Sequence, residues 1–163
     1  MKVKAGTDDF FELTYSKKSK IDSSNKTWDD GYTASQRINF GGAITAVEGG
    51  GYLNSIKFTT EHPASVKVWW VQGGEVGSSR QVAILTEAGA QVAVTEDASA
   101  KNAVVYSELK LEDAGTYYLG NLVGSNYLFK IEVEEEKAAE PIDSILDATA
   151  DLAAMAAADA NEV

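Results

Sequence analysis

The chain of 163 residues contains no cysteine and only one histidine. Without cysteine, neither a disulfide nor a thiolate metal site can stabilise the fold. The lone histidine, His62, stands beside Pro63 in a predicted turn, which is a poor position for a preorganised base. A nucleophile elbow and a glycine-rich phosphate loop that opens a helix are also missing. Enzymatic activity is therefore the least favoured of the functions considered.

Long apolar runs are absent as well, and none could cross a bilayer as a helix. We expect no membrane partner. The first residues lack the apolar segment of a signal peptide. This pattern fits a cytoplasmic protein or a domain cut from a longer secreted chain.

Acidic residues outnumber basic ones by 25 to 14, but the two kinds are unevenly distributed. Ten acids and a single base lie from residue 132 onward, so residues 1–131 hold 15 acids and 13 bases. The body is nearly neutral and the tail is acidic. A nucleic-acid-binding protein shows a basic stripe, and we therefore expect no nucleic-acid partner.

Short strand patterns recur along the body. Between residues 113 and 133, two of them flank a polar tip, and the second alternates so that one face is buried by Tyr127, Phe129, Ile131 and Val133. Eight to ten such strands at regular spacing predict an all-β fold, an antiparallel β-sandwich of jelly-roll or immunoglobulin-like type. The expected inward residues are Phe58, Val68, Trp70, Ile84, Tyr117, Phe129 and Ile131.

Composition divides the chain into three parts. Residues 1–27 are expected to form an N-terminal strand at 10–15 and a polar loop at 16–26, and residues 28–134 the sandwich. Residues 135–163 read as an acidic linker and an amphipathic helix. Pro141 suits a first helical turn, and an apolar stripe follows, so the helix is predicted from Pro141 to Ala157.

The chain has only two arginines, Arg37 and Arg80, each at or beside a predicted strand. The planar fork of arginine binds carboxylates in a bidentate manner. Lys67 and Trp69 share a strand face, where an outward tryptophan could stack on a sugar ring or on a lysine. The favoured alternative for Trp69 is packing in a second layer or under the tail helix. For the arginines, a binding site and a plain surface position remain equally open.

Two acid pairs, Asp29–Asp30 and Glu96–Asp97, could bind Ca²⁺ together with backbone carbonyls. They lack the alternating oxygen spacing of a dedicated calcium loop. Solvated turn residues are the favoured interpretation, and we expect no cofactor.

The segment Asp113-Ala-Gly-Thr-Tyr-Tyr-Leu119 resembles the strand of immunoglobulin variable domains in which Asp-x-Gly-x-Tyr forms the tyrosine corner. Leu119 stands where that family has cysteine, and no partner cysteine precedes it. This departure removes the disulfide of the family but leaves the sandwich possible.

A series of motifs over residues 28–133 is similar to the β-sandwich carbohydrate-binding modules attached to bacterial pectate lyases. The motifs are Arg37-Ile-Asn-Phe-Gly-Gly, Asn54-Ser-Ile-Lys-Phe-Thr-Thr, Val66-Lys-Val-Trp-Trp-Val, Ser79-Arg80, Ala114-Gly-Thr-Tyr-Tyr-Leu-Gly and Phe129-Lys-Ile-Glu-Val. Members of that family are non-catalytic, and some bind pectic homogalacturonan through basic side chains.

This resemblance implies that Arg37 and Arg80 occupy basic binding positions. The third basic position falls near Asn121, where no base stands. Together with Lys67, Trp69 and Asn126, these residues make up the expected ligand-binding set. The implied protein is a secreted, non-catalytic module of a multi-domain enzyme, with pectin or another acidic plant cell-wall polysaccharide as its partner. The alternative is an immunoglobulin-like structural or adhesion module without a small ligand.

Overall fold

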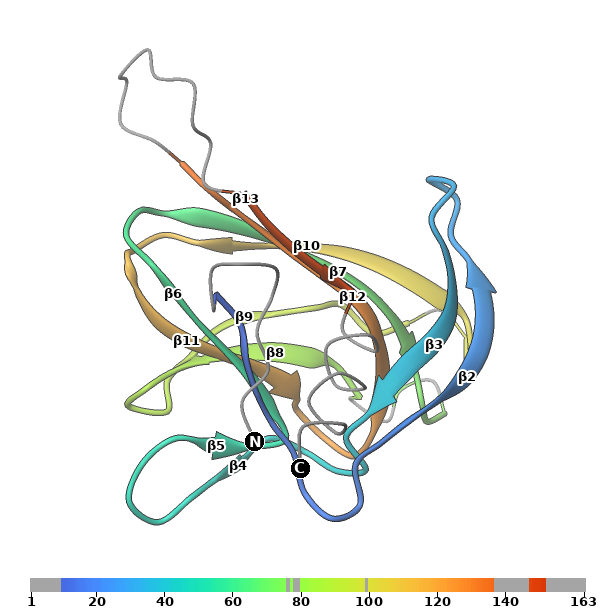
Figure 1. Cartoon of the computed structure of the whole chain (residues 1–163), viewed down its shortest axis with the longest axis horizontal. Coiled ribbons are helices and arrows are strands. Elements are labelled where there is room, and N and C mark those ends of the chain that lie inside the picture. Colours follow the sequence, from blue (N-terminus) through green and yellow to red (C-terminus); the bar gives the residue numbers. More distant parts are fainter. Residues whose placement is uncertain (1–9, 76, 78–79, 99, 137–146, 152–163) are drawn as a thin grey trace.

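A computed structural model describes residues 10–75, 77, 80–98, 100–136 and 147–151. This part of the chain forms two large antiparallel sheets (Figure 1), which confirms the predicted all-β sandwich. In spatial order, the first sheet contains β1 (Glu12–Thr14), β6 (Ser55–Thr60), β11 (Gly115–Asn121), β8 (Val82–Thr86) and β9 (Gln91–Val94).

The second sheet contains, in spatial order, β10 (Val104–Leu111), β7 (Ala64–Gln72), β12 (Asn126–Glu135), β3 (Thr33–Asn39) and β2 (Lys20–Thr27). A further strand, β13 (Asp147–Asp151), pairs with β12. The short strands β4 (Thr45–Ala46) and β5 (Tyr52–Leu53) form a separate hairpin that projects beyond the first sheet (Figure 1).

Four antiparallel strand pairs are nested along the sequence. β3 pairs with β12, β6 with β11, β7 with β10, and β8 with β9. The chain is thus a long hairpin that folds back on itself and rolls into two sheets, which is the jelly-roll arrangement. Immunoglobulin sheets have a different strand order, so the jelly roll is the one of the two expected architectures that this chain adopts.

The main hydrophobic core lies between the two sheets. Six of the seven predicted inward residues belong to it: Phe58, Val68, Trp70, Ile84, Tyr117 and Ile131. Trp70 is fully buried, and its indole nitrogen donates a 3.0 Å hydrogen bond to the hydroxyl of Ser107. Strand alternation therefore predicted this core well.

The predicted phase of β12 is wrong at its start. The register shifts between Leu128 and Lys130, which marks a β-bulge at Phe129. Leu128 points into the main core, whereas Phe129 packs on the opposite face of the sheet. The bulge adds one residue to the strand, so the alternation that assigned Tyr127 and Phe129 to the inner face fails there.

The predicted loop at residues 16–26 is also wrong from residue 20 onward, where β2 begins. This strand pairs with β3 at the edge of the second sheet, and its side chains are exposed or half-buried. An edge strand with no buried apolar face can have a lysine- and serine-rich sequence. The composition of this segment therefore resembled that of a loop.

The predicted helix from Pro141 to Ala157 is wrong for residues 147–151, which form β13. β3 pairs with β12 only at Tyr127 and Leu128, and β13 pairs with Lys130 to Glu134 farther along β12. Backbone pairing along this free edge overrides the helical pattern of the tail. Residues 141–146 and 152–157 lie outside the described residues. Among the described residues, no helix is long and apolar enough to span a membrane.

Candidate functional site

Arg37 lies on the outer face of the second sheet. It stands directly opposite Asp22 on the neighbouring strand β2, and this register produces a two-pronged contact. The Nε atom of Arg37 lies 2.7 Å from Oδ1 of Asp22, and Nη2 lies 3.3 Å from Oδ2. The hydrogen bond from Arg37 lowers the pKa of the Asp22 carboxyl. The charge of Arg37 is therefore compensated locally.

Arg37 also stacks on an aromatic ring. Its Cζ atom lies 3.6 Å from the centroid of the Tyr127 ring, which is a close cation–π contact. This contact holds the guanidinium over the Tyr127 ring on β12, and 20% of the Arg37 side chain is exposed. Arginine and tyrosine together present a planar, partly cationic surface.

Arg80 lies just before β8 and reaches the turn that precedes β12. Its Nη1 atom donates a 3.3 Å hydrogen bond to the carbonyl oxygen of Ser125. Gly74 and Gly124 leave the space in which the guanidinium lies, because a Cβ atom on Gly124 would fall 2.8 Å from the Arg80 Cζ atom. A side chain at either glycine would therefore displace the guanidinium of Arg80 from this position.

The structure thus brings both arginines to one short segment, residues 124–127. We call Arg37, Arg80, Ser125 and Tyr127 the arginine surface. Arg37 contacts it through the Tyr127 ring, and Arg80 through the Ser125 carbonyl. The sequence indicated the two arginines but not the segment that joins them.

The two asparagines of the expected set are fully buried and do not join this surface. Asn126 accepts a 3.1 Å hydrogen bond from the backbone nitrogen of Gly73. Asn121 donates a 3.4 Å hydrogen bond to the carbonyl oxygen of Gly42. Both side chains hold neighbouring loops and face the interior.

Trp69 belongs to a second hydrophobic cluster, on the outer face of the second sheet. This outer cluster consists of Trp28, Trp69, Val71 and Phe129, with Tyr32 and Tyr127 packed against it. Only 5% of Trp69 is exposed, so its ring is not an open platform. It packs in a second layer, as the favoured interpretation predicted, but beneath the turn between β2 and β3.

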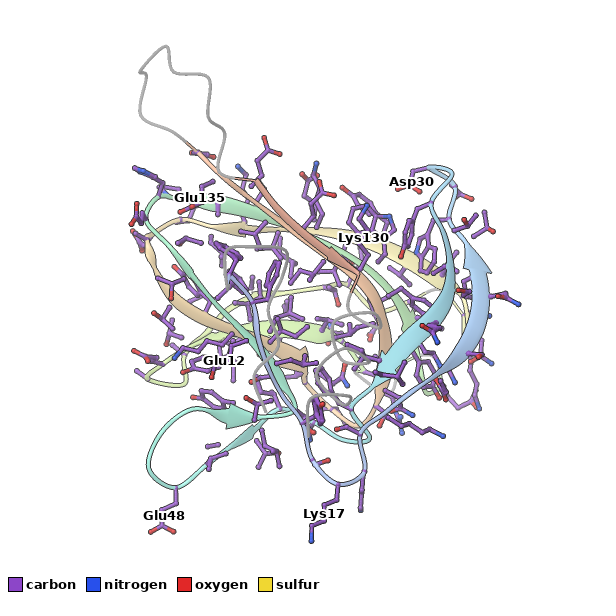
Figure 2. The ribbon with its side chains drawn as sticks, viewed as in Figure 1. Glu12, Lys17, Asp30, Glu48, Lys130 and Glu135 are labelled. Carbon is purple, nitrogen blue, oxygen red and sulfur yellow. The ribbon has the colours of Figure 1, made fainter. Side chains whose placement is uncertain are left out.

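Polar contacts fix the Trp69 ring from two sides. Its indole nitrogen donates a 2.8 Å hydrogen bond to Oδ2 of Asp30, and the Lys130 ammonium lies 4.6 Å from its centroid. Figure 2 shows Asp30 at the tip of the β2–β3 hairpin and Lys130 below it on β12. The pKa of Asp30 is lowered mainly by the hydrogen bond from the Tyr32 backbone, and further by the hydrogen bond from Trp69.

Lys67 shares the outer face with Trp69 but lies between two carboxylates. Its ammonium is 3.9 Å from Glu132 and 3.9 Å from Glu134. The positive charge is compensated, and Lys67 does not contribute to the arginine surface. Tyr106, which sequence reasoning missed, is the exposed aromatic on this face at 41% exposure, and its ring lies 4.9 Å from that of Trp69.

No sequence signal pointed to Asp22, because that residue fell in a predicted loop. Tyr127 was also missed, because uninterrupted strand alternation assigned its side chain to the inner face. Within the described ranges, no group of three or more His, Asp or Glu side chains is placed to hold a metal ion.

No protein-family model matches the chain, and no curated protein matches it.

Proposed function

We propose that this chain is a non-catalytic carbohydrate-binding module for an acidic plant cell-wall polysaccharide such as pectin, appended to a secreted enzyme. The observation that supports this proposal is the convergence of the only two arginines on residues 124–127. An acidic polysaccharide presents regularly spaced carboxylates. Two guanidinium groups on one segment, one of them stacked on tyrosine, suit such a ligand.

Arg37 retains hydrogen-bonding capacity despite its pairing with Asp22. A guanidinium has five N–H donors, and the contact with Asp22 uses one on Nε and one on Nη2. The other donors form no hydrogen bond with another described residue. A ligand carboxylate would therefore compete with Asp22 for charge but not for every donor.

Affinity for a single sugar unit should be low. An exposed charge pair contributes about 0.2–1 kcal/mol, and Asp22 offsets part of the attraction. A polymer compensates because neighbouring units rebind at high effective concentration. Binding should also weaken as salt rises, because these charges are only partly buried.

Isothermal titration with polygalacturonate at low and high salt tests the proposal. The wild type should bind at low salt, and the double variant Arg37→Ala, Arg80→Ala should not. Asp22→Asn should tighten binding by up to about fivefold, because it releases the Arg37 charge from a pair worth about 0.2–1 kcal/mol.

The matched control is Glu136→Gln, which removes one negative charge from the exposed pair with Lys110. It should leave the affinity close to that of the wild type. Equal tightening by Glu136→Gln and Asp22→Asn would mean that only net charge matters. A folded double arginine variant that binds like the wild type would refute the site.

A structural or adhesive module without a small ligand is the second candidate. The hydroxyl of Tyr117 donates a 2.5 Å hydrogen bond to the carbonyl oxygen of Asp113, which is the tyrosine-corner contact of immunoglobulin domains. This candidate predicts that the wild type binds no polysaccharide under any of the titration conditions.

A further inference from the structure

A groove of about 380 Å³ lies on the outer face of the first sheet, on the opposite side of the sandwich from Arg37. β1, β6 and β11 form its floor, and the β4–β5 hairpin forms one wall. Its volume falls in the range of about 300–1,000 Å³ that is typical of small-ligand sites.

Three residues from three neighbouring strands form a row across the floor. Glu12 on β1 stands directly opposite Lys57 on β6, and Lys57 stands opposite Tyr118 on β11. The Lys57 ammonium lies 5.8 Å from the centroid of the Tyr118 ring. An acid, a base and an aromatic ring are therefore fixed side by side by strand register.

A second aromatic ring comes from the hairpin wall. Tyr52 packs edge-on against Tyr118, with ring centroids 4.9 Å apart and an interplanar angle of 62°. Tyr118 is buried, whereas Tyr52 is half-exposed beside the groove. Glu87, in the turn between β8 and β9, completes the rim.

The tip of the hairpin requires glycine. Gly49, Gly50 and Gly51 have φ angles of 93°, 113° and 81°, in the region that other residues rarely adopt. Gly49 and Gly50 have open space where a Cβ would stand, so the backbone conformation selects these glycines. Figure 2 shows Glu48 at this tip, directed away from the sandwich.

The base of the hairpin is anchored to the body. The backbone nitrogen of Ile44 donates a 2.8 Å hydrogen bond to the carbonyl oxygen of Asn121. Asn54, buried with a φ angle of 60°, donates to the carbonyl oxygen of Ala43 and accepts from the backbone nitrogen of Ser16. These contacts hold the Tyr52 wall in place before any ligand arrives.

We propose that this groove is a second binding site, which takes a neutral sugar unit of a polysaccharide. A pyranose ring has an apolar face that packs on tyrosine, and its hydroxyls donate to carboxylates and accept from an ammonium group. Among the described residues that line the groove, Lys57 is the only cation, and it lies with the carboxylates of Glu12 and Glu87, whereas the arginine surface has two guanidinium groups. A uronate therefore fits the arginine surface better, and a neutral sugar fits the groove.

Titration with cellohexaose, xylohexaose and mannohexaose, with trigalacturonate as the acidic comparison, tests this site. At least one neutral oligosaccharide should bind, and amide shifts in heteronuclear NMR spectra should gather on β1, β6, β11 and the β4–β5 hairpin. Tyr52→Ala should weaken that binding about tenfold, as expected for the loss of one stacking ring.

The matched control is Tyr106→Ala, which removes an exposed tyrosine from the other sheet. It should leave neutral-sugar binding unchanged. If Tyr52→Ala fails to fold, Thr14→Trp fills the groove from β1 and should abolish binding. The proposal is overturned if no neutral oligosaccharide binds at millimolar concentration, or if the folded groove variants bind as the wild type does.

The result is separable from the proposed function. The double arginine variant should lose polygalacturonate binding and keep neutral-sugar binding. Tyr52→Ala should weaken neutral-sugar binding and keep polygalacturonate binding. Loss of both ligands in either variant would show that the two faces do not act as separate sites, and would overturn the assignment of the groove.

Discussion

The two hydrophobic clusters of this protein lie on opposite faces of the same sheet and are built in different ways. The inner core joins both sheets, and its residues follow strand alternation. The outer cluster has one sheet beneath it and a hairpin above it, with Trp28 in the hairpin and Phe129 at a bulge. A regular pattern is sufficient for the first cluster, whereas the second depends on a break in that pattern.

The hydrogen-bond acceptors of the tryptophans also differ between the two clusters. In the inner core, Trp70 donates to a buried side-chain hydroxyl. In the outer cluster, Trp28 donates a 2.8 Å bond to the carbonyl oxygen of Val105, and Trp69 donates to Asp30 at the hairpin tip. The outer cluster therefore couples the β2–β3 hairpin to the strands below it.

The largest expected effect is that of removing a whole ring from either cluster. Phe129→Ala should lower the free energy of unfolding by about 3–5 kcal/mol, because Phe129 is fully buried, and Trp70→Ala should do the same in the inner core. Chemical denaturation measures both. A cost for Phe129→Ala well below about 1 kcal/mol would show that the outer cluster adds little to stability.

A smaller change compares the clusters through their indole groups. Trp70→Phe and Trp28→Phe each remove one donor and part of a ring. For Trp70→Phe we expect the free energy of unfolding to fall by about 2–4 kcal/mol, because the change leaves a closed cavity. For Trp28→Phe we expect a fall of about 1–2 kcal/mol, because the hairpin can move into the space that is left. Equal costs would mean that the hairpin is as rigid as the core.

The tyrosine corner tests the edge of the inner core. Tyr117→Phe removes only the hydroxyl that bonds to Asp113, and should cost about 1 kcal/mol of unfolding free energy. Thermal melting should show a small fall in midpoint with unchanged cooperativity. Tyr106→Phe, on the exposed outer face, is the control and should have no measurable effect.

The smallest expected effect concerns the hairpin that covers the outer cluster. The Arg37 hydrogen bond lowers the folded-state pKa of Asp22 below 3.8. The stabilisation that the Asp22 carboxylate provides is therefore fully present above its unfolded-state pKa. It is lost as the pH falls through its folded-state pKa. For this partly exposed pair we expect at most about 0.5–1 kcal/mol.

Urea denaturation between neutral and strongly acidic pH checks this sign. Asp22→Asn should remove part of the pH dependence, whereas Asp29→Asn, at the exposed tip of the same hairpin, should preserve it. Identical pH profiles for Asp22→Asn and the wild type would contradict a stabilising role of the pair.

Strand alternation and turn chemistry predicted the sandwich and six of its core residues. They failed for features that depend on pairing between segments far apart in the sequence. The bulge at Phe129 inverts the faces at the start of β12, and no local signal marks it. β2 was missed because an edge strand needs no apolar face, and β13 because an open strand edge competes with helical periodicity.

The candidate site shows the same limit. The two arginines could be recognised because the chain has no others, and Gly74 and Gly124 stand near Arg80 only after folding. The Asp22 partner and the Tyr127 ring follow from strand register, which the sequence does not state. Burial of Asn121 and Asn126 follows from the loops that they hold.

The nested strand pairing has a consequence for how the chain acquires its structure. One edge of β3 pairs with the preceding strand β2, but its other edge pairs with β12, so the outermost pair of the nest joins segments far apart in sequence. Contacts of such high sequence separation slow folding to the range of about milliseconds to seconds. On the ribosome, the early strands must wait with unpaired edges until nearly the whole chain has emerged, and this interval is when the protein is most exposed to aggregation.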